Sequence, residues 1–160
     1  MPVVDLLELP AAASPRTPLI GLDLGEKTIG VAVSDPARMI ASPLELIRKT
    51  KFTADAERLF QLVDSRDVGG VVIGLPVNMD GSEGPRAQSA RAFARNLLRL
   101  REIAIALWDE RLSTAAVQRM MVAEQNLTRA RRAKLVDKTA AAWILQGALD
   151  RLGTLSQEKE

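Results

Sequence analysis

The apolar residues of the chain recur with two different periods, which predict short strands alternating with amphipathic helices. Short apolar runs of strand length occur at residues 19–25, 28–34, 40–47, 70–74 and 103–108. Pro43 interrupts the third run, which favours an edge position for that strand, because proline has no backbone N–H for a sheet ladder. Helical periodicity is found at residues 52–65, 87–101, 113–123 and 133–152.

The order of these elements predicts an α/β fold. A meander of three antiparallel strands followed by β-α-β crossovers gives a mixed five-stranded sheet flanked by helices on both faces. The length of 160 residues fits one domain, which we expect to span residues 19–153. Residues 1–18 are rich in Pro and Ala and are expected to form a flexible leader. Residues 154–160 are expected to form a polar tail.

Three residue types are missing, and their absence limits the chemistry. The chain contains no Cys, no His and no Tyr. Thiolate nucleophiles, Ser-His-Asp triads, cysteine- or histidine-ligated metals and covalent tyrosine links to nucleic acid are therefore excluded. If the chain is an enzyme, the remaining groups favour carboxylates that hold a hard cation such as Mg²⁺ or Mn²⁺.

The charge distribution points mildly to a polyanionic partner. The formal net charge is only +2, but both ends of the chain are acidic and the body between them is more basic. Positive charge gathers at residues 86–101 and 129–138. Arg91, Arg95 and Arg99 recur every four residues on one helix face, which suits either phosphate contacts or an ordinary solvated face. The second stretch contains Arg129, Arg131 and Arg132, which could bring a nucleic acid backbone to Asp137 nearby.

No targeting or membrane segment is evident in the sequence. The first ten residues lack the basic start of a signal peptide and contain Asp5 and Glu8. No apolar stretch approaches the roughly 18 residues of a membrane-spanning helix. We therefore expect a cytoplasmic protein with no membrane partner.

An acidic residue interrupts the first predicted strand. Alternation places Asp23 on the same strand face as Gly21 and Gly25. A carboxylate inside a core strand is costly unless its charge is compensated, and the two glycines leave space beside it. A metal ion or a phosphate-bearing ligand would explain both features. The alternative is an aspartate that caps a turn at the strand end.

Two further acidic residues, Asp109 and Glu110, follow the last predicted strand. Open α/β sheets bind ligands at the carboxyl ends of their strands. Alternation groups Glu110 with Ala104 and Ala106, and this small-residue face favours Glu110 as the ligand-binding residue. Asp109 stays open as the alternative, since the faces of separate strands cannot be matched from sequence. A charged strand end, with Asp109 in an ion pair with Arg111, would also explain the segment.

A last acidic residue lies on the inward face of the C-terminal helix. Asp137 is followed at +4, +7 and +11 by Ala141, Ile144 and Ala148, which places it within the apolar stripe. A charge there is penalised unless it is paired, for instance with Arg132, or bound to a metal. Together with Asp23 and Glu110, it suggests a shared Mg²⁺ or Mn²⁺ site. Two such ions about 4 Å apart support in-line phosphoryl displacement.

The loop at residues 74–85 is a weaker candidate for phosphate binding. Its glycines permit close backbone approach, and Asn78 and Ser82 offer polar side chains. The cations near this loop and near the acidic residues complete the candidate nucleic-acid interface. In full, its residues are Asn78, Ser82, Arg86, Arg91, Arg95, Arg99, Arg111, Arg129, Arg131 and Arg132.

Four of these segments together resemble the YqgF (RuvX-like) family. They are residues 21–35, 74–85, 109–114 and 137–146, in the family's order, and the resemblance spans about residues 19–152. It implies a ribonuclease H-like fold in the clan of the RuvC resolvases. It also implies a cytoplasmic, metal-dependent nuclease with Asp23, Glu110 (or Asp109) and Asp137 as its acidic residues. Lys27 would then contact the scissile phosphate.

The resemblance leaves three functions open. The family is described as a nuclease that matures the 5′ end of pre-16S ribosomal RNA and as a Holliday junction resolvase, which would need a homodimer. Related resolvases often have two acids in the last helix, whereas here no acid follows Asp137 until Asp150. A non-catalytic nucleic-acid-binding factor in ribosome assembly is therefore the third alternative. An ATP-using fold of the actin and sugar-kinase type needs two domains and does not fit this length.

Overall fold

The computed structural model describes residues 3–112 and 140–153. Asp137, Arg129, Arg131, Arg132, the predicted helix at 113–123 and the predicted tail at 154–160 lie outside these residues. Within the described ranges, no helix has both the length and the apolar character needed to cross a membrane.

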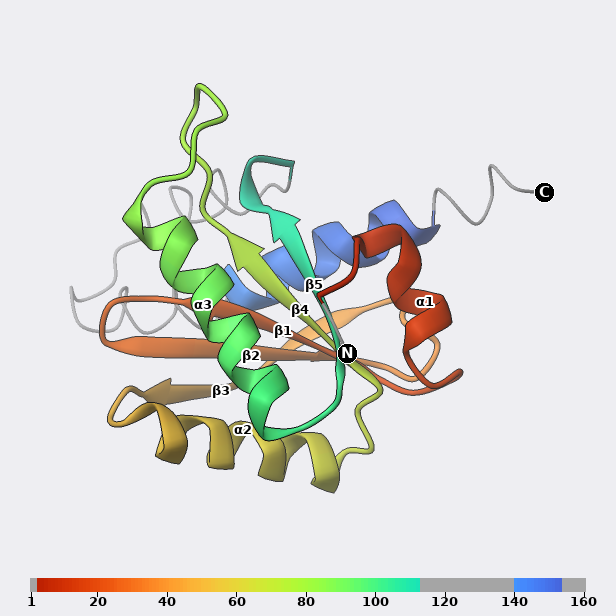
Figure 1. Cartoon of the computed structure of the whole chain (residues 1–160). Coiled ribbons are helices and arrows are strands. Elements are labelled where there is room, and N and C mark those ends of the chain that lie inside the picture. The colour runs from red at the N-terminus through yellow and green to blue at the C-terminus, as the bar shows by residue number, and fades with distance from the viewer. Residues whose placement is uncertain (1–2, 113–139, 154–160) are drawn as a thin grey trace, which may run out of the picture.

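The described residues form a five-stranded mixed sheet, as the sequence predicts (Figure 1). The strands are β1 Leu19–Leu24, β2 Thr28–Ser34, β3 Ala41–Arg48, β4 Gly70–Leu75 and β5 Ala104–Asp109. Their order in the sheet is β3-β2-β1-β4-β5. The pairs β1–β2 and β2–β3 are antiparallel, whereas β1–β4 and β4–β5 are parallel. The carboxyl ends of β1, β4 and β5 therefore meet at one edge of the sheet.

The predicted edge position of the strand that contains Pro43 is confirmed. β3 is the outer strand beyond β2, and its register shifts between Val31 and Ala32, where Pro43 pairs with Ala32. A proline is tolerated there because an outer strand leaves one side of its backbone unpaired.

Two helices cover one face of the sheet, α2 Phe52–Ser65 and α3 Pro85–Leu100 (Figure 1). They enclose the larger core, with the strand residues Ile20 and Leu22 packed in one cluster with Leu59 of α2 and Leu97 of α3. The buried face of α3 consists of alanines with Leu97, whereas Leu100, the last residue of the helix, is 52% exposed.

A third helix, residues 140–153, covers the opposite face. Its buried residues include Ala141, Ile144 and Leu145. This helix lies very close to β1 at Gly21, where an added Cβ would lie 2.6 Å from the Cβ of Leu145. Gly21 is therefore required for the close approach of helix and strand, on the sheet face that it shares with Asp23.

The N-terminal segment differs from the flexible leader that its composition suggested. Residues Leu6–Glu8 form the 3₁₀ helix η1 and Leu9–Ala12 the short helix α1. Leu6 and Leu9 are buried in a second core, which lies between the sheet and the helix at 140–153 and also contains Trp108. Upstream of them, Val4 forms a parallel bridge to Ala106, on the outer strand β5. The segment is ordered because its few apolar residues cover a core face and an otherwise open sheet edge. The Pro and Ala content of the segment gave no indication of this packing.

Candidate active site

Asp23 is a buried carboxylate near the carboxyl end of β1. It is 7% exposed, and Asp23, Ser34 and Asp55 are the polar or charged side chains buried within the described residues. The predicted alternation is confirmed, since Ile20 and Leu22 pack in the core beneath α2 and α3, whereas Gly21 contacts the helix at 140–153. Asp23 therefore belongs to the face of the sheet that this helix covers.

The Glu110 side chain lies over Gly74 on the same sheet face. A Cβ at Gly74 would lie 2.7 Å from Oε1 of Glu110 and 2.7 Å from Cδ1 of Ile144. Leu22 pairs with Ile73 in parallel register, so Asp23 and Gly74 are the next neighbours along the two strands. The Glu110 side chain thus extends over β4 towards β1 at a position, Gly74, where β4 has no side chain. The fold brings two carboxylates from distant parts of the sequence to one place.

Asp109 has a different environment from its neighbour. Its carboxylate accepts hydrogen bonds from Nη2 of Arg111 at 2.7 Å and from the backbone N–H of Arg111 at 2.9 Å. The hydrogen bond from the Arg111 side chain holds the pKa of the Asp109 carboxyl below its ordinary value. The ion pair considered from the sequence is thus present, and the Asp109 carboxylate is directed to Arg111, whereas the Glu110 carboxylate lies over Gly74.

The backbone N–H bond to Asp109 also shapes the chain around Glu110. It joins residues two apart as an Asx turn at the start of the 3₁₀ helix η2, Glu110–Leu112, directly after β5. Because Glu110 lies between the two bonded residues, the bond restricts its backbone. Asp109 and Arg111 therefore restrain the backbone from which the Glu110 side chain projects.

The loop between β4 and α3 is closed by its own polar groups. The backbone N–H of Asn78 donates to the Ser82 carbonyl at 2.9 Å, and Nδ2 of Asn78 donates to Oγ of Ser82 at 3.0 Å. Ser82 in turn donates to Oδ1 of Asp80 through its hydroxyl and its backbone N–H. Asn78 and Ser82, predicted as phosphate contacts, thus have structural partners within the loop. From outside the loop, Nη1 of Arg111 donates to the Asn78 carbonyl at 3.3 Å.

Two cations lie at the same edge of the sheet as Asp23. Nη2 of Arg86 donates to the carbonyl of Leu24, the last residue of β1, at 3.4 Å. A carbonyl is neutral, so this bond does not itself compensate the Arg86 charge. Lys27 lies in the turn between β1 and β2 and is exposed. Both residues are placed where an anion bound near Asp23 would meet a positive charge.

The predicted arginine stripe on α3 is not uniform. Arg91 forms a two-pronged ion pair with Glu83, with nitrogen–oxygen distances of 2.6 and 2.7 Å. Sequence reasoning missed Glu83, because it lies eight residues away and outside the helix. Arg95 and Arg99 are exposed, and no ion pair links either to another described residue. They are the members of the stripe left available for phosphates.

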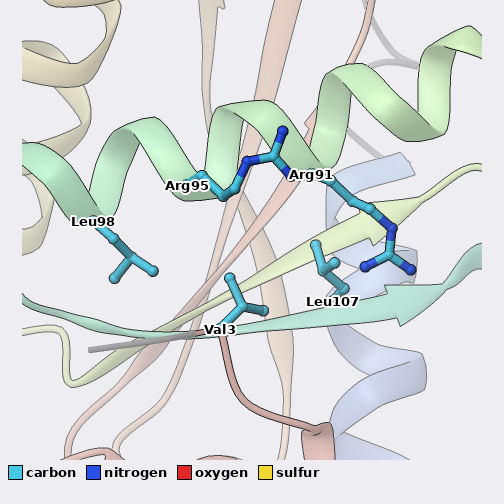
Figure 2. Close-up of a pocket in the computed structure, with 5 residues that line it drawn as sticks. All are labelled: Val3, Arg91, Arg95, Leu98 and Leu107. Atoms are coloured by element: carbon cyan, nitrogen blue, oxygen red, sulfur yellow. The ribbon is translucent and has the colours of Figure 1, made fainter.

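A groove of about 380 Å³ lies beside this stripe. Figure 2 shows Arg91 and Arg95 above it on α3, with Leu107 of β5 and Val3 opposite them. Leu107 packs with the core beneath α3, whereas Trp108 packs with the core on the other face. The groove is therefore on the sheet face opposite Asp23 and Glu110, and it is separate from the carboxylate pair.

The carboxylate pair fits part of a metal site. Asp23 and Glu110 supply the hard oxygen donors that Mg²⁺ and Mn²⁺ prefer, and the missing side chain at Gly74 leaves the space in which Glu110 lies. Over residues 3–112 and 140–153, no group of three or more acidic side chains is close enough to hold a metal ion. Asp137, the third predicted ligand, lies outside these ranges.

Comparison with known proteins identifies the family. The family model described as "RuvX: Holliday junction resolvase" matches residues 17–151. The chain belongs to the RuvX family. A family member from Phenylobacterium zucineum, named "Putative pre-16S rRNA nuclease", is 73% identical over 97% of this chain and 100% of its own length. A Caulobacter relative of the same name is 60% identical over 98% of this chain and 96% of its own length.

Solved structures place this RuvX chain in the predicted fold. Thermus thermophilus RuvC, solved in complex with a Holliday junction substrate, matches with a TM-score of 0.53 at 13% identity over 86% of this chain and 97% of its own. The yeast mitochondrial Holliday junction resolvase Ydc2 matches with a TM-score of 0.52 at 11% identity over 95% and 86% of the two chains. The predicted ribonuclease H-like fold and the resemblance to RuvX proteins are both confirmed.

Proposed function

We propose that this RuvX protein is a metal-dependent nuclease that processes the 5′ end of pre-16S ribosomal RNA in the cytoplasm. The observation that supports it most directly is the convergence of Asp23 and Glu110 over Gly74, at the edge where the parallel strands end. The name of the curated relatives supports the substrate. Hydrolysis by carboxylates also suits a chain without Cys, His or Tyr.

Asp23 and Glu110 are the described residues that would hold Mg²⁺ or Mn²⁺, and Asp137 is proposed to complete the set. A divalent cation held there would supply Lewis-acid stabilisation of the charge that develops on the phosphate oxygens. The protein must keep two carboxylates ionised at close range for this purpose. Asp23 is buried on the sheet face that the helix at 140–153 covers, and a cation held there would be shielded from water, which strengthens its attraction to the carboxylate.

The surrounding cations are proposed to bind and orient the nucleic acid. Arg86, held at the end of β1, and Lys27, in the adjacent turn, would contact phosphates next to the bond that is cut. Arg95 and Arg99 would bind phosphates further along the substrate. Arg111 and Asp109 would keep Glu110 aimed at the site, and Arg129, Arg131 and Arg132 are proposed as additional backbone contacts.

A second candidate function is Holliday junction resolution, which the description of the family model favours. A resolvase cuts two strands, so this alternative requires a homodimer with two active sites. Oligomeric state and substrate choice therefore distinguish the two candidates.

The two functions are tested by offering the protein a precursor 16S RNA and a four-way DNA junction side by side, with Mg²⁺ or Mn²⁺. We expect metal-dependent cutting of the RNA by a protein that needs no dimer. Preferred cutting of the junction by a dimer would replace RNA processing with resolution. Binding of either substrate without cutting would instead indicate a non-catalytic assembly factor.

A further inference from the structure

The most exposed large apolar side chain of the described residues is at the edge of the candidate active site. Met79 is 93% exposed, compared with 67% for Met39 at the turn between β2 and β3. It lies in the loop between β4 and α3, which projects beyond the ends of β4 and β5 (Figure 1). Single exposed apolar residues are common on protein surfaces. Two features distinguish Met79 from such residues: its place beside the candidate active site and the fixed backbone on either side of it.

The backbone on either side of Met79 is fixed. Asn78 and Gly81 are joined by a backbone hydrogen bond of 2.9 Å, and Asn78 and Ser82 by another of the same length. Gly81 has a φ of +90°, which closes the turn at a value that other residues rarely adopt. The Met79 side chain is therefore presented to solvent on a constrained tip, so binding a partner costs little backbone entropy.

The tip is connected directly to the carboxylate pair. Asn78, next to Met79, accepts a hydrogen bond from Nη1 of Arg111, next to Glu110. The loop that contains Met79 therefore contacts the segment that contains Glu110. Arg86, at the start of α3, adds a positive charge at the same edge of the sheet. An apolar side chain beside a cation and the proposed hydrolytic site suits a nucleic acid, which offers both stacked bases and anionic phosphates.

We propose that Met79 is an apolar wedge that inserts between stacked bases at the end of a helical segment of the substrate, next to the bond that is cut. This inference rests on the proposed nuclease function and adds how a structured substrate is recognised. Methionine is one of the side chains that unstack base steps in this way, and its polarisable sulfur makes favourable contacts with aromatic rings. Unstacking a base step is unfavourable, and phosphate contacts with nearby cations would offset that cost.

Base unstacking tests the wedge separately from cleavage. The probe is a short RNA duplex with single-stranded flanks and 2-aminopurine at the helix end, mixed with protein that has Asp23→Asn and cannot cut. We expect 2-aminopurine fluorescence to rise on binding. The rise should be lost with Met79→Ala, kept with Met79→Leu, and unaffected by the matched control Met39→Ala.

Cleavage provides the second readout. In the otherwise unchanged protein, Met79→Ala should lower kcat/KM about tenfold on the duplex with flanks and leave cutting of a fully single-stranded RNA unchanged. If the fluorescence does not rise, or rises equally with Met79→Ala, the proposal that Met79 unstacks bases is wrong, even if cleavage is normal. If the protein cuts nothing but Met79 still governs the fluorescence, the nuclease proposal fails and the wedge stands.

Discussion

The Glu110 carboxylate occupies the place where any side chain at position 74 would begin. An ideal Cβ on Gly74 would lie 2.7 Å from Oε1 of Glu110, closer than real Cβ contacts come. β4 runs between the strand that contains Asp23 and the strand that precedes Glu110. The glycine therefore lets an acid from the end of β5 approach an acid of β1 across the strand between them.

Gly74→Ala should separate the two carboxylates. The added methyl would contact Oε1 of Glu110 and Cδ1 of Ile144, so the Glu110 side chain must move. We expect kcat/KM for cleavage to fall at least tenfold, with a small loss in the free energy of unfolding, because both contacted atoms are the ends of flexible side chains that can move. Gly84→Ala is the matched control, since its Cβ would lie an ordinary 3.6 Å from Nδ2 of Asn78. Equal activity of the two variants would contradict the role of Gly74.

Gly21→Ala should destabilise the fold at the contact between β1 and the helix at 140–153. Its Cβ would lie 2.6 Å from the Cβ of Leu145, an atom fixed to the helix backbone that cannot rotate away. We expect urea denaturation to show a loss of about 1–3 kcal/mol. Gly153→Ala, where the added Cβ meets nothing within 4 Å, should be neutral or stabilising by up to about 1 kcal/mol. A stable Gly21→Ala protein would show that the helix packs less closely than described.

The Asp109–Arg111 pair should make a small contribution to stability that depends on pH. The hydrogen bond from the Arg111 side chain lowers the pKa of the Asp109 carboxyl from its ordinary 3.8. The contribution is therefore full above pH about 4 and is lost as the pH falls through the lower pKa of the folded state. Since the pair is partly exposed, we expect Asp109→Asn to cost about 0.5 kcal/mol at pH 7 and less at pH 3. Denaturant titrations at both pH values measure this, and a constant difference would argue against the pair.

Arg95 and Arg99 should contribute to the salt dependence of nucleic acid binding. Neither has an ion-pair partner among the described residues, so both are available for phosphates. Replacing both with Gln should reduce the slope of log K against log salt by up to about 1.4 for single-stranded RNA, or about 0.7 per phosphate contact. Arg58→Gln is the control, because Arg58 is already paired with Glu45 on the α2 side. If the double variant keeps the wild-type slope, this face of α3 is only solvated.

The strands and the main helices could be predicted from the sequence because their apolar periods agree with the tertiary packing. The helix at 52–65 was predicted with the bounds that α2 has, and Pro43 marked the outer strand. The N-terminal segment was not predicted, because Val4, Leu6 and Leu9 are too few to outweigh the surrounding Pro and Ala. Their order depends on a sheet edge and a core face contributed by distant residues.

The candidate site could be predicted in part for the same reason. Burial of Asp23 follows from alternation along its own strand, which is local information. The choice between Asp109 and Glu110 depends on the bond from Arg111 and on the space above Gly74. The bond from Arg111 to Asp109 could be suspected from the spacing of the two residues. The space above Gly74 could not, because it depends on the pairing of β4 with β5. The ion pair of Arg91 with Glu83 likewise depends on how the loop enters α3.

The central claim is that the carboxylates of Asp23 and Glu110 form a metal-dependent hydrolytic site. The most direct measurement is the rate of Mg²⁺- or Mn²⁺-dependent cleavage of precursor 16S RNA by Asp23→Asn and Glu110→Gln, with Asp109→Asn as the matched control. Each of the first two variants should lose activity at least a hundredfold while keeping most RNA affinity. Asp109→Asn should keep most of the activity, because the Oδ1 of an asparagine still accepts the backbone N–H bond from Arg111 that restrains Glu110. Full activity in Asp23→Asn or Glu110→Gln would contradict the account.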